Sequence, residues 1–142
     1  MSASVMPFLE RLVRHFFADQ CELIAAYFAY PMPFYAKDDL AVFTAPHALA
    51  EGLRAYRHAT QTAGIVDLKP RIVAEGLPVR RYSSLWVEWD HLDADGACVL
   101  TSQVRYVLHD DPGDVDPKIE MVDYTRLAFP EITTHLPMAA SA

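Results

Sequence analysis

Cysteine and glycine are scarce in this sequence, which has two cysteines and five glycines among 142 residues. Two cysteines are too few to staple a small secreted domain with disulfides. Cys21 and Cys98 lie in apolar stretches, so we expect both to be small hydrophobic residues of the core. The glycines form neither a phosphate-binding loop nor a nucleophile elbow, and the sequence therefore gives no support for a dinucleotide-binding role.

Positive charge is also in short supply, since 12 Lys and Arg stand against 19 Asp and Glu, a formal net charge of −7. Nucleic-acid affinity comes largely from Lys and Arg that displace counterions, so we expect no nucleic-acid partner. No window approaches the ~20 apolar residues of a membrane-spanning helix. Residues 1–17 have no basic leader ahead of their apolar stretch. We therefore expect a cytoplasmic protein without a membrane partner.

Apolar residues are abundant by contrast. They make up 52% of the chain and include seven Tyr, seven Phe and two Trp. A chain of this length is expected to form one domain that buries roughly 68% of its unfolded surface. The aromatic content exceeds what a minimal core needs. We therefore expect a lined cavity in addition to a packed core.

The hydrophobic period changes from helical to alternating along the chain. The pattern predicts helices over 5–17, 20–29 and 46–64, short extended pieces over 34–36 and 40–44, and strands over 65–74, 80–92, 97–108 and 118–129. Helices followed by long antiparallel strands indicate an α+β fold. We expect one domain over 1–130 and a loose tail over 131–142.

Three stretches carry a family resemblance: FADQCELIAAY at 17–27, GLRAYR at 52–57 and KIEMVDY at 118–124. With the order of elements, they make the chain similar to the nuclear transport factor 2-like superfamily, which includes polyketide cyclases, ketosteroid isomerases and limonene-epoxide hydrolases. The resemblance implies three N-terminal helices packed in a strongly curved mixed or antiparallel sheet, a cone with an internal pocket. It also implies a homodimer through the outer sheet face.

The catalytic pattern of ketosteroid isomerases is not present. Alignment by eye places Tyr35 at the position of their general base and Arg11 at that of their oxyanion-hole tyrosine. Their second acid falls near Val104. All three roles are unfilled, which disfavours isomerase chemistry of that type.

The Asp–Arg–Asp set of limonene-epoxide hydrolases is matched in part. Asp123 and Asp90 occupy the two acidic positions, but Glu88 stands where the arginine belongs. Without a cation between them, neighbouring carboxylates raise each other's pKa instead of dividing into acid and base. Arg105 could replace the arginine only if it faced the same way. Asp123 and Asp90 are the catalytic candidates that this resemblance implies.

Strand parity predicts which side chains meet the helices. On 97–108 the inward set is Cys98, Leu100, Ser102, Val104, Tyr106 and Leu108. On 80–92 the more apolar choice points Leu85, Val87 and Trp89 inward and leaves Trp86, Glu88 and Asp90 outside, unless a bulge reverses Asp90.

Asp123 alternates with Ile119, Met121 and Leu127 and is expected on an apolar face. Burial there would raise the pKa of its carboxyl group, as suits a general acid or base. The alternative is an ion pair with Arg105 or Arg126 at the end of the sheet.

The expected ligand pocket is aromatic, because buried phenols seek hydrogen-bond partners and a pocket can supply them. Its predicted ligand-binding residues, some placed by the resemblance, are Tyr27, Tyr35, Tyr56, Trp89, Ser102 and Tyr106. The six histidines show no paired ligand spacing, so we expect no metal. His58 is the histidine nearest the predicted pocket helix.

These observations leave two functions open. The first is a small-molecule enzyme without a cofactor, a lyase, isomerase or hydrolase acting on a hydrophobic or aromatic compound. The alternative is a non-catalytic ligand-binding or dimeric interaction module, since one fold hosts many functions.

Overall fold

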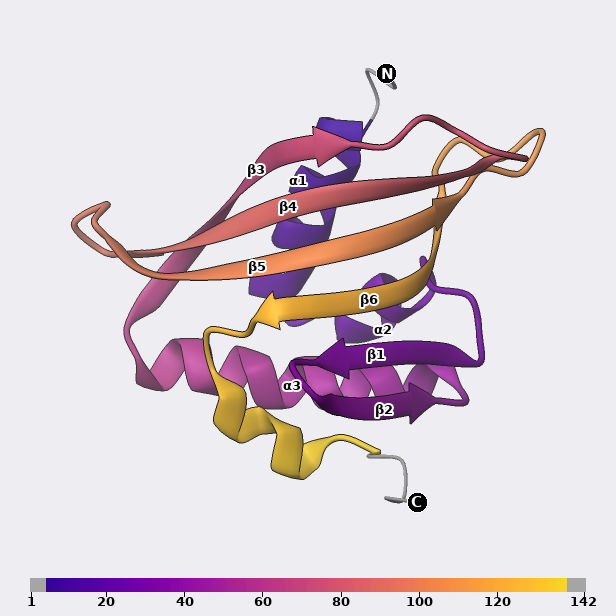
Figure 1. Ribbon diagram of the computed structural model, residues 1–142. Helices are drawn as coiled ribbons and strands as arrows, with labels where there is room; N and C mark the ends of the chain where they lie inside the picture. Colours follow the sequence, from indigo (N-terminus) through magenta and orange to yellow (C-terminus); the bar gives the residue numbers. More distant parts are fainter. Residues whose placement is uncertain (1–4, 138–142) are drawn as a thin grey trace.

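The computed structural model describes residues 5–137 of the chain. Helices and strands follow each other in an α+β order (Figure 1). The elements are α1 (Val5–Phe17), α2 (Cys21–Ala25), β1 (Met32–Ala36), β2 (Asp39–Phe43), α3 (Pro46–Thr62), β3 (Ile65–Glu75), β4 (Tyr82–Asp93), β5 (Cys98–His109), β6 (Lys118–Arg126) and a 3-10 helix, η1 (Pro130–His135).

The six strands form one mixed sheet in the order β2-β1-β6-β5-β4-β3. Strands β1 and β6 pair in parallel, and every other pair is antiparallel. The sheet is curled but not closed, and the three helices lie on one side of it (Figure 1). The predicted fold class is confirmed.

Helix α1 has the predicted bounds, because its apolar residues form one continuous stripe. The stripe is buried against the sheet and consists of Val5, Phe8, Leu9, Leu12 and Phe16. Helix α2 is shorter than predicted. The chain leaves it to pair with β6, where Phe28 forms a bridge with Ile119 and the Ala29 N–H donates to the Ile119 carbonyl at 2.9 Å.

The predicted inward faces of β4 and β5 are confirmed by burial except at the start of β5, where Cys98 is exposed and Leu100 is only partly buried. Leu85, Val87 and Trp89 are buried on β4, and Ser102, Val104, Tyr106 and Leu108 are buried on β5. The register shift of β4 comes after His91, so it does not turn Asp90 inward.

The two cysteines differ in their burial. Cys21 is buried as expected, but Cys98 is exposed, so the expectation that it is a core residue was wrong. Cys98 begins β5 beside the β4–β5 hairpin, which extends past the helices at one end of the sheet (Figure 1). Parity alone could not show where helical cover ends.

Strand β6 changes face part-way along its length. Val107 pairs with Met121 and Leu108 with Ile119, so Glu120 is an extra residue in the ladder. A bulge of this kind reverses the alternation beyond it. Ile119 and Val122 are therefore both buried, although they are three residues apart.

The segment after β6 packs on the domain. Leu127, Phe129 and Ile132 are buried, and the Val42 N–H on the edge strand β2 donates to the Pro137 carbonyl at 3.1 Å. The part of the expected loose tail that the structure describes, 131–137, therefore contributes to the core. Residues 138–142 of that tail lie outside the described residues.

Candidate functional site

A cavity of about 130 Å³ lies between the three helices and the inner face of the sheet. Side chains from α1, α2 and α3, from all six strands and from the η1 segment form its wall. Among the described residues, none that lines it is Asp, Glu, Lys or Arg. An apolar wall without a charged group favours a neutral, hydrophobic ligand.

Polar atoms reach this wall from five aromatic side chains, and they form two separate hydrogen-bonded groups. The five residues are Tyr56 on α3, Trp89 and His91 on β4, Tyr106 on β5 and Tyr124 on β6.

The first group joins Tyr56 to His91. The Tyr56 hydroxyl lies 2.5 Å from His91 Nε2, and His91 Nδ1 lies 3.0 Å from the Trp89 carbonyl oxygen. A carbonyl can only accept, so Nδ1 carries a proton and donates it. In the neutral imidazole, Nε2 then accepts a hydrogen bond from Tyr56.

His91 is fully buried, with 0% of its surface exposed. Desolvation lowers the pKa of its imidazole below the ordinary value of 6.5, although backbone hydrogen bonds to Trp89 and Leu100 oppose the shift. His91 is therefore neutral at neutral pH and keeps a free base directed at Tyr56. Burial also raises the pKa of Tyr56, which holds its hydroxyl in the protonated form.

The second group joins Trp89 to two tyrosines. Trp89 Nε1–H donates to the Tyr106 hydroxyl at 2.8 Å, and the Tyr106 hydroxyl is hydrogen-bonded to that of Tyr124. Burial raises the pKa of Tyr124 to about 12, so it too stays protonated at neutral pH. Each of these groups is neutral, as an apolar cavity requires.

Three of the six predicted ligand-binding residues line the cavity: Tyr56, Trp89 and Tyr106. Ser102 is buried behind Tyr56, with its hydroxyl 3.4 Å from that of Tyr56. Tyr27 does not line the cavity and packs edge-on against Phe8.

Tyr35 lies elsewhere as well. It is 38% exposed, and in the register of β1 with β6 it stands beside Asp123 on a face that does not line the cavity. The expectation that Tyr27 and Tyr35 meet the pocket came from the resemblance, and the structure does not bring them there.

Asp123 also lies away from the cavity, which corrects the expectation that it faces an apolar pocket. Its side chain is 32% exposed and lies 3.8 Å from Arg105 Nη2, the ion pair that was the alternative. The β6 bulge is the reason, because it turns Tyr124 inward and Asp123 outward.

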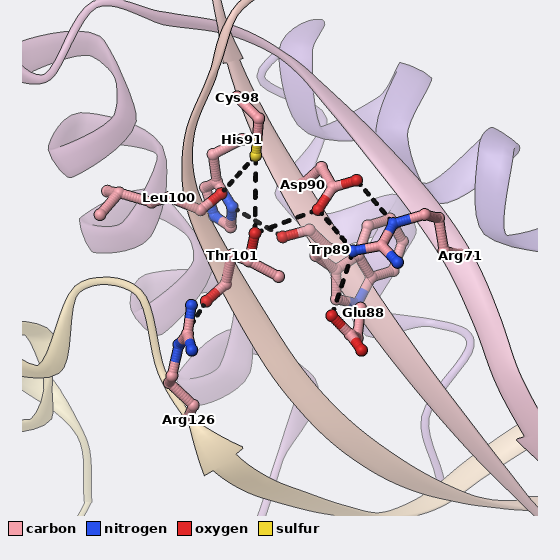
Figure 2. A network of polar contacts seen from close by, with 9 residues as sticks. All are labelled: Arg71, Glu88, Trp89, Asp90, His91, Cys98, Leu100, Thr101 and Arg126. Carbon is pink, nitrogen blue, oxygen red and sulfur yellow. Dashed lines mark hydrogen bonds and ion pairs between the residues drawn. The ribbon is translucent and has the colours of Figure 1, made fainter.

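Asp90 belongs to a polar network on the outer face of the sheet (Figure 2). The Arg71 side chain donates to both of its carboxylate oxygens, at 2.7 and 2.9 Å, and the Thr101 hydroxyl donates at 3.1 Å. Arg71 also reaches Glu88 at 3.1 Å. The hydrogen bond from Arg71 is the main cause that lowers the pKa of Asp90. Neither catalytic candidate therefore lines the cavity.

Of the five aromatic side chains that bring polar atoms to the cavity wall, His91 and Tyr124 were absent from the predicted set. His91 follows Leu85, Val87 and Trp89 in the same alternation, so its inward position could have been derived from parity. Tyr124 could not, because its orientation depends on the bulge. His58, singled out among the histidines, does not line the cavity.

Comparison with solved structures identifies the architecture. Aln2 from a Streptomyces species superposes with a TM-score of 0.63 at 20% identity, over 87% of this chain and 88% of that one. A designed protein named Rd1NTF2_05 gives 0.62 at 8% identity, over 85% and 96%. The chain has the nuclear transport factor 2-like cone fold. A Catenulispora acidiphila protein solved in complex with S-DNPA gives 0.57 at 15% identity, over 86% and 91%.

Searches by sequence find no match among protein-family models or curated proteins. Within the part of the chain that the structure describes, no helix is long and apolar enough to cross a membrane. Over the same residues, His, Cys, Asp and Glu form no group of three or more that could hold a metal ion.

Proposed function

We propose that the cavity binds a small hydrophobic or aromatic compound and that Tyr56 and His91 carry out acid–base chemistry on it without a cofactor. The observation that carries the proposal is the 2.5 Å contact between Tyr56 Oη and His91 Nε2 in the wall of an uncharged cavity. The volume of about 130 Å³ is close to that of an apolar protein cavity of roughly 150 Å³ that takes benzene. The complex of the Catenulispora acidiphila protein supports small-molecule binding by this fold.

The proton transfer follows from the bonding of the pair. A ligand group gives a proton to Tyr56 Oη while the Tyr56 proton moves to His91 Nε2. The ligand then carries the negative charge, Tyr56 stays neutral and His91 becomes an imidazolium. The reverse transfer returns the proton to another ligand atom, which is the requirement for an isomerase, lyase or hydrolase. The Trp89 carbonyl stabilises the imidazolium through Nδ1–H.

One observation favours the second candidate, a non-catalytic ligand-binding protein. No carboxylate of the described residues lines the cavity, so the acid and base would have to be a phenol and an imidazole. The two candidates share the ligand and differ in turnover.

Binding can be tested with p-xylene in a Trp86→Phe background, where Trp89 is the remaining tryptophan. We expect saturable change of Trp89 fluorescence and a higher melting temperature, because a ligand that binds only the folded state stabilises it. A Val122→Phe variant, which fills the cavity, should lose both effects. The matched variant Val99→Phe changes a residue that is 50% exposed and does not line the cavity, and it should keep them. Absence of binding to the folded wild type would overturn the proposal.

Turnover can be tested by incubating the protein with an extract of small metabolites and following changes by mass spectrometry. The enzyme proposal predicts a conversion that disappears in a Tyr56→Phe variant whose p-xylene binding is intact. A conversion unchanged by Tyr56→Phe would overturn the assigned chemistry. Binding of p-xylene without any conversion supports the second candidate instead.

A further inference from the structure

The hydrogen atoms around Tyr56 can be counted from its contacts. A phenol has one proton to donate and two lone pairs that accept. The proton goes to His91 Nε2, since His91 Nδ1–H is already committed to the Trp89 carbonyl. Tyr56 therefore has no proton left for a ligand while His91 is neutral.

The lone pairs of Tyr56 are only partly used. Ser102 Oγ accepts the Ala128 N–H at 3.0 Å, which leaves the Ser102 proton free for Tyr56 Oη at 3.4 Å. One lone pair of Tyr56 remains. Tyr56 is partly buried and lines the cavity, so a ligand bound there is the partner that we assign to this lone pair. Donation to His91 polarises the phenol and strengthens it as an acceptor.

The second polar group of the wall, which consists of Trp89, Tyr106 and Tyr124, supplies a hydrogen-bond donor. Trp89 Nε1–H donates to the Tyr106 hydroxyl, and one of the hydroxyls of Tyr106 and Tyr124 donates to the other. These two hydrogen bonds leave one hydroxyl proton of Tyr106 or Tyr124 unused, and both residues line the same cavity. The wall thus presents an acceptor at Tyr56 and a donor at the Tyr106–Tyr124 pair, with no charged side chain among the lining residues described.

We propose that the ligand of this cavity is a neutral ring compound with a hydroxyl group, a phenol, enol or alcohol, whose O–H donates to Tyr56 Oη. The inference rests on the proposed function and narrows its ligand class. A carboxylate ligand is disfavoured because it has no proton to donate and no cation in the wall to compensate its charge. A hydrocarbon leaves the Tyr56 lone pair unsatisfied.

The test compares p-cresol with p-xylene, which have nearly the same shape and differ by a hydroxyl in place of a methyl group. Both are titrated by Trp89 fluorescence in the Trp86→Phe background. Tyr56→Phe should weaken p-cresol roughly threefold to tenfold, the usual effect of a lost hydrogen bond, and change p-xylene less than about twofold. Tyr27→Phe removes a hydroxyl outside the cavity and should change neither.

A comparison of ligands alone makes the test independent of how well Tyr56→Phe folds. The hydroxyl of p-chlorophenol is a stronger donor than that of p-cresol, and chlorine and methyl are of similar size. The dissociation constant of p-cresol divided by that of p-chlorophenol should therefore exceed the dissociation constant of p-xylene divided by that of p-chlorotoluene, by at least about twofold.

The outcomes separate the two proposals. If none of these compounds binds to the folded protein, the proposed function is overturned, and this inference with it. If p-cresol and p-xylene both bind but Tyr56→Phe weakens them equally, or weakens neither, the hydroxyl preference is overturned and the cavity stands. Equal ratios for the phenol and hydrocarbon pairs would also overturn the preference.

Discussion

At the scale of single residues, His91 is both a buried side chain and the base of the proposed chemistry. It is fully buried, its Nδ1–H donates to a backbone carbonyl and its Nε2 receives the Tyr56 hydroxyl. In the neutral form, Nδ1–H donates to the carbonyl and Nε2 accepts from Tyr56, so both nitrogens are satisfied without a charge. The geometry and the lowered pKa of His91 point the same way.

His91 should make the protein less stable in mild acid. The unfolded chain takes up a proton near pH 6.5 while the folded protein does so only at lower pH. The stability is therefore complete above pH 6.5 and falls as the pH drops toward the folded pKa. Urea unfolding should show that His91→Gln removes part of this loss. An identical pH dependence in wild type and variant would contradict the account of His91.

Asp123, in contrast to His91, is expected to contribute little to ligand binding or to stability. Because its side chain is partly exposed and beside Arg105, Asp123→Asn should leave the p-cresol affinity within about twofold of wild type and cost at most about 1 kcal/mol of stability. Fluorescence titration and urea unfolding measure the two quantities. A loss of binding much larger than twofold would place Asp123 in the site after all.

At the scale of elements, regular alternation was predictable and its interruptions were not. Strands β4 and β5 keep one parity over their central residues, and the inward faces followed from the sequence. The β6 bulge at Glu120 leaves no composition signal, since it is set by the pairing with β5. That one bulge explains why Asp123 was expected inside and Tyr124 was not considered.

The packing of the C-terminal segment is a second feature that could not be predicted from the sequence. The prolines and small residues after Phe129 are typical of a loose end, but Ile132 and Leu136 lie against the cavity. Leu136 packs close to Gly52 of α3, where a Cβ atom would come within 3.0 Å of Leu136 Cδ2. The glycine that weakens the helix locally gives room to the segment that covers it.

Substitution of Ile132 tests whether the segment after β6 is packed on the domain in solution. It is 6% exposed, and Ile132→Ala should cost about 2 kcal/mol or more, as for other large-to-small substitutions of buried residues. The control is Val115→Ala in the β5–β6 loop, where the residue is 89% exposed and no change is expected. Urea unfolding compares the two. Equal stability of both variants and wild type would mean that the segment is loose in solution.

At the scale of the whole molecule, the concave face of the sheet is filled by helices and the outer face is not. Trp86 is 40% exposed there, near the network of Arg71, Glu88 and Asp90. A large exposed aromatic residue beside fixed polar groups is typical of an interface. The proposed homodimer would cover this face.

Trp86→Glu should therefore shift sedimentation toward the monomer, because it buries an unpaired charge in the proposed interface. Val115→Glu, which introduces the same charge in the β5–β6 loop, is the control and should sediment as wild type does. A Trp86→Glu protein that sediments as wild type would refute the assignment of this face.

The central claim is that one cavity between helices and sheet holds a small hydroxylated ring against Tyr56. A crystal structure of the protein soaked with p-cresol tests it most directly. The account predicts electron density for the ring inside the cavity, with its oxygen within hydrogen-bonding distance of Tyr56 Oη. A cavity closed by side chains, or a ring bound there with its oxygen turned away from Tyr56, would contradict it.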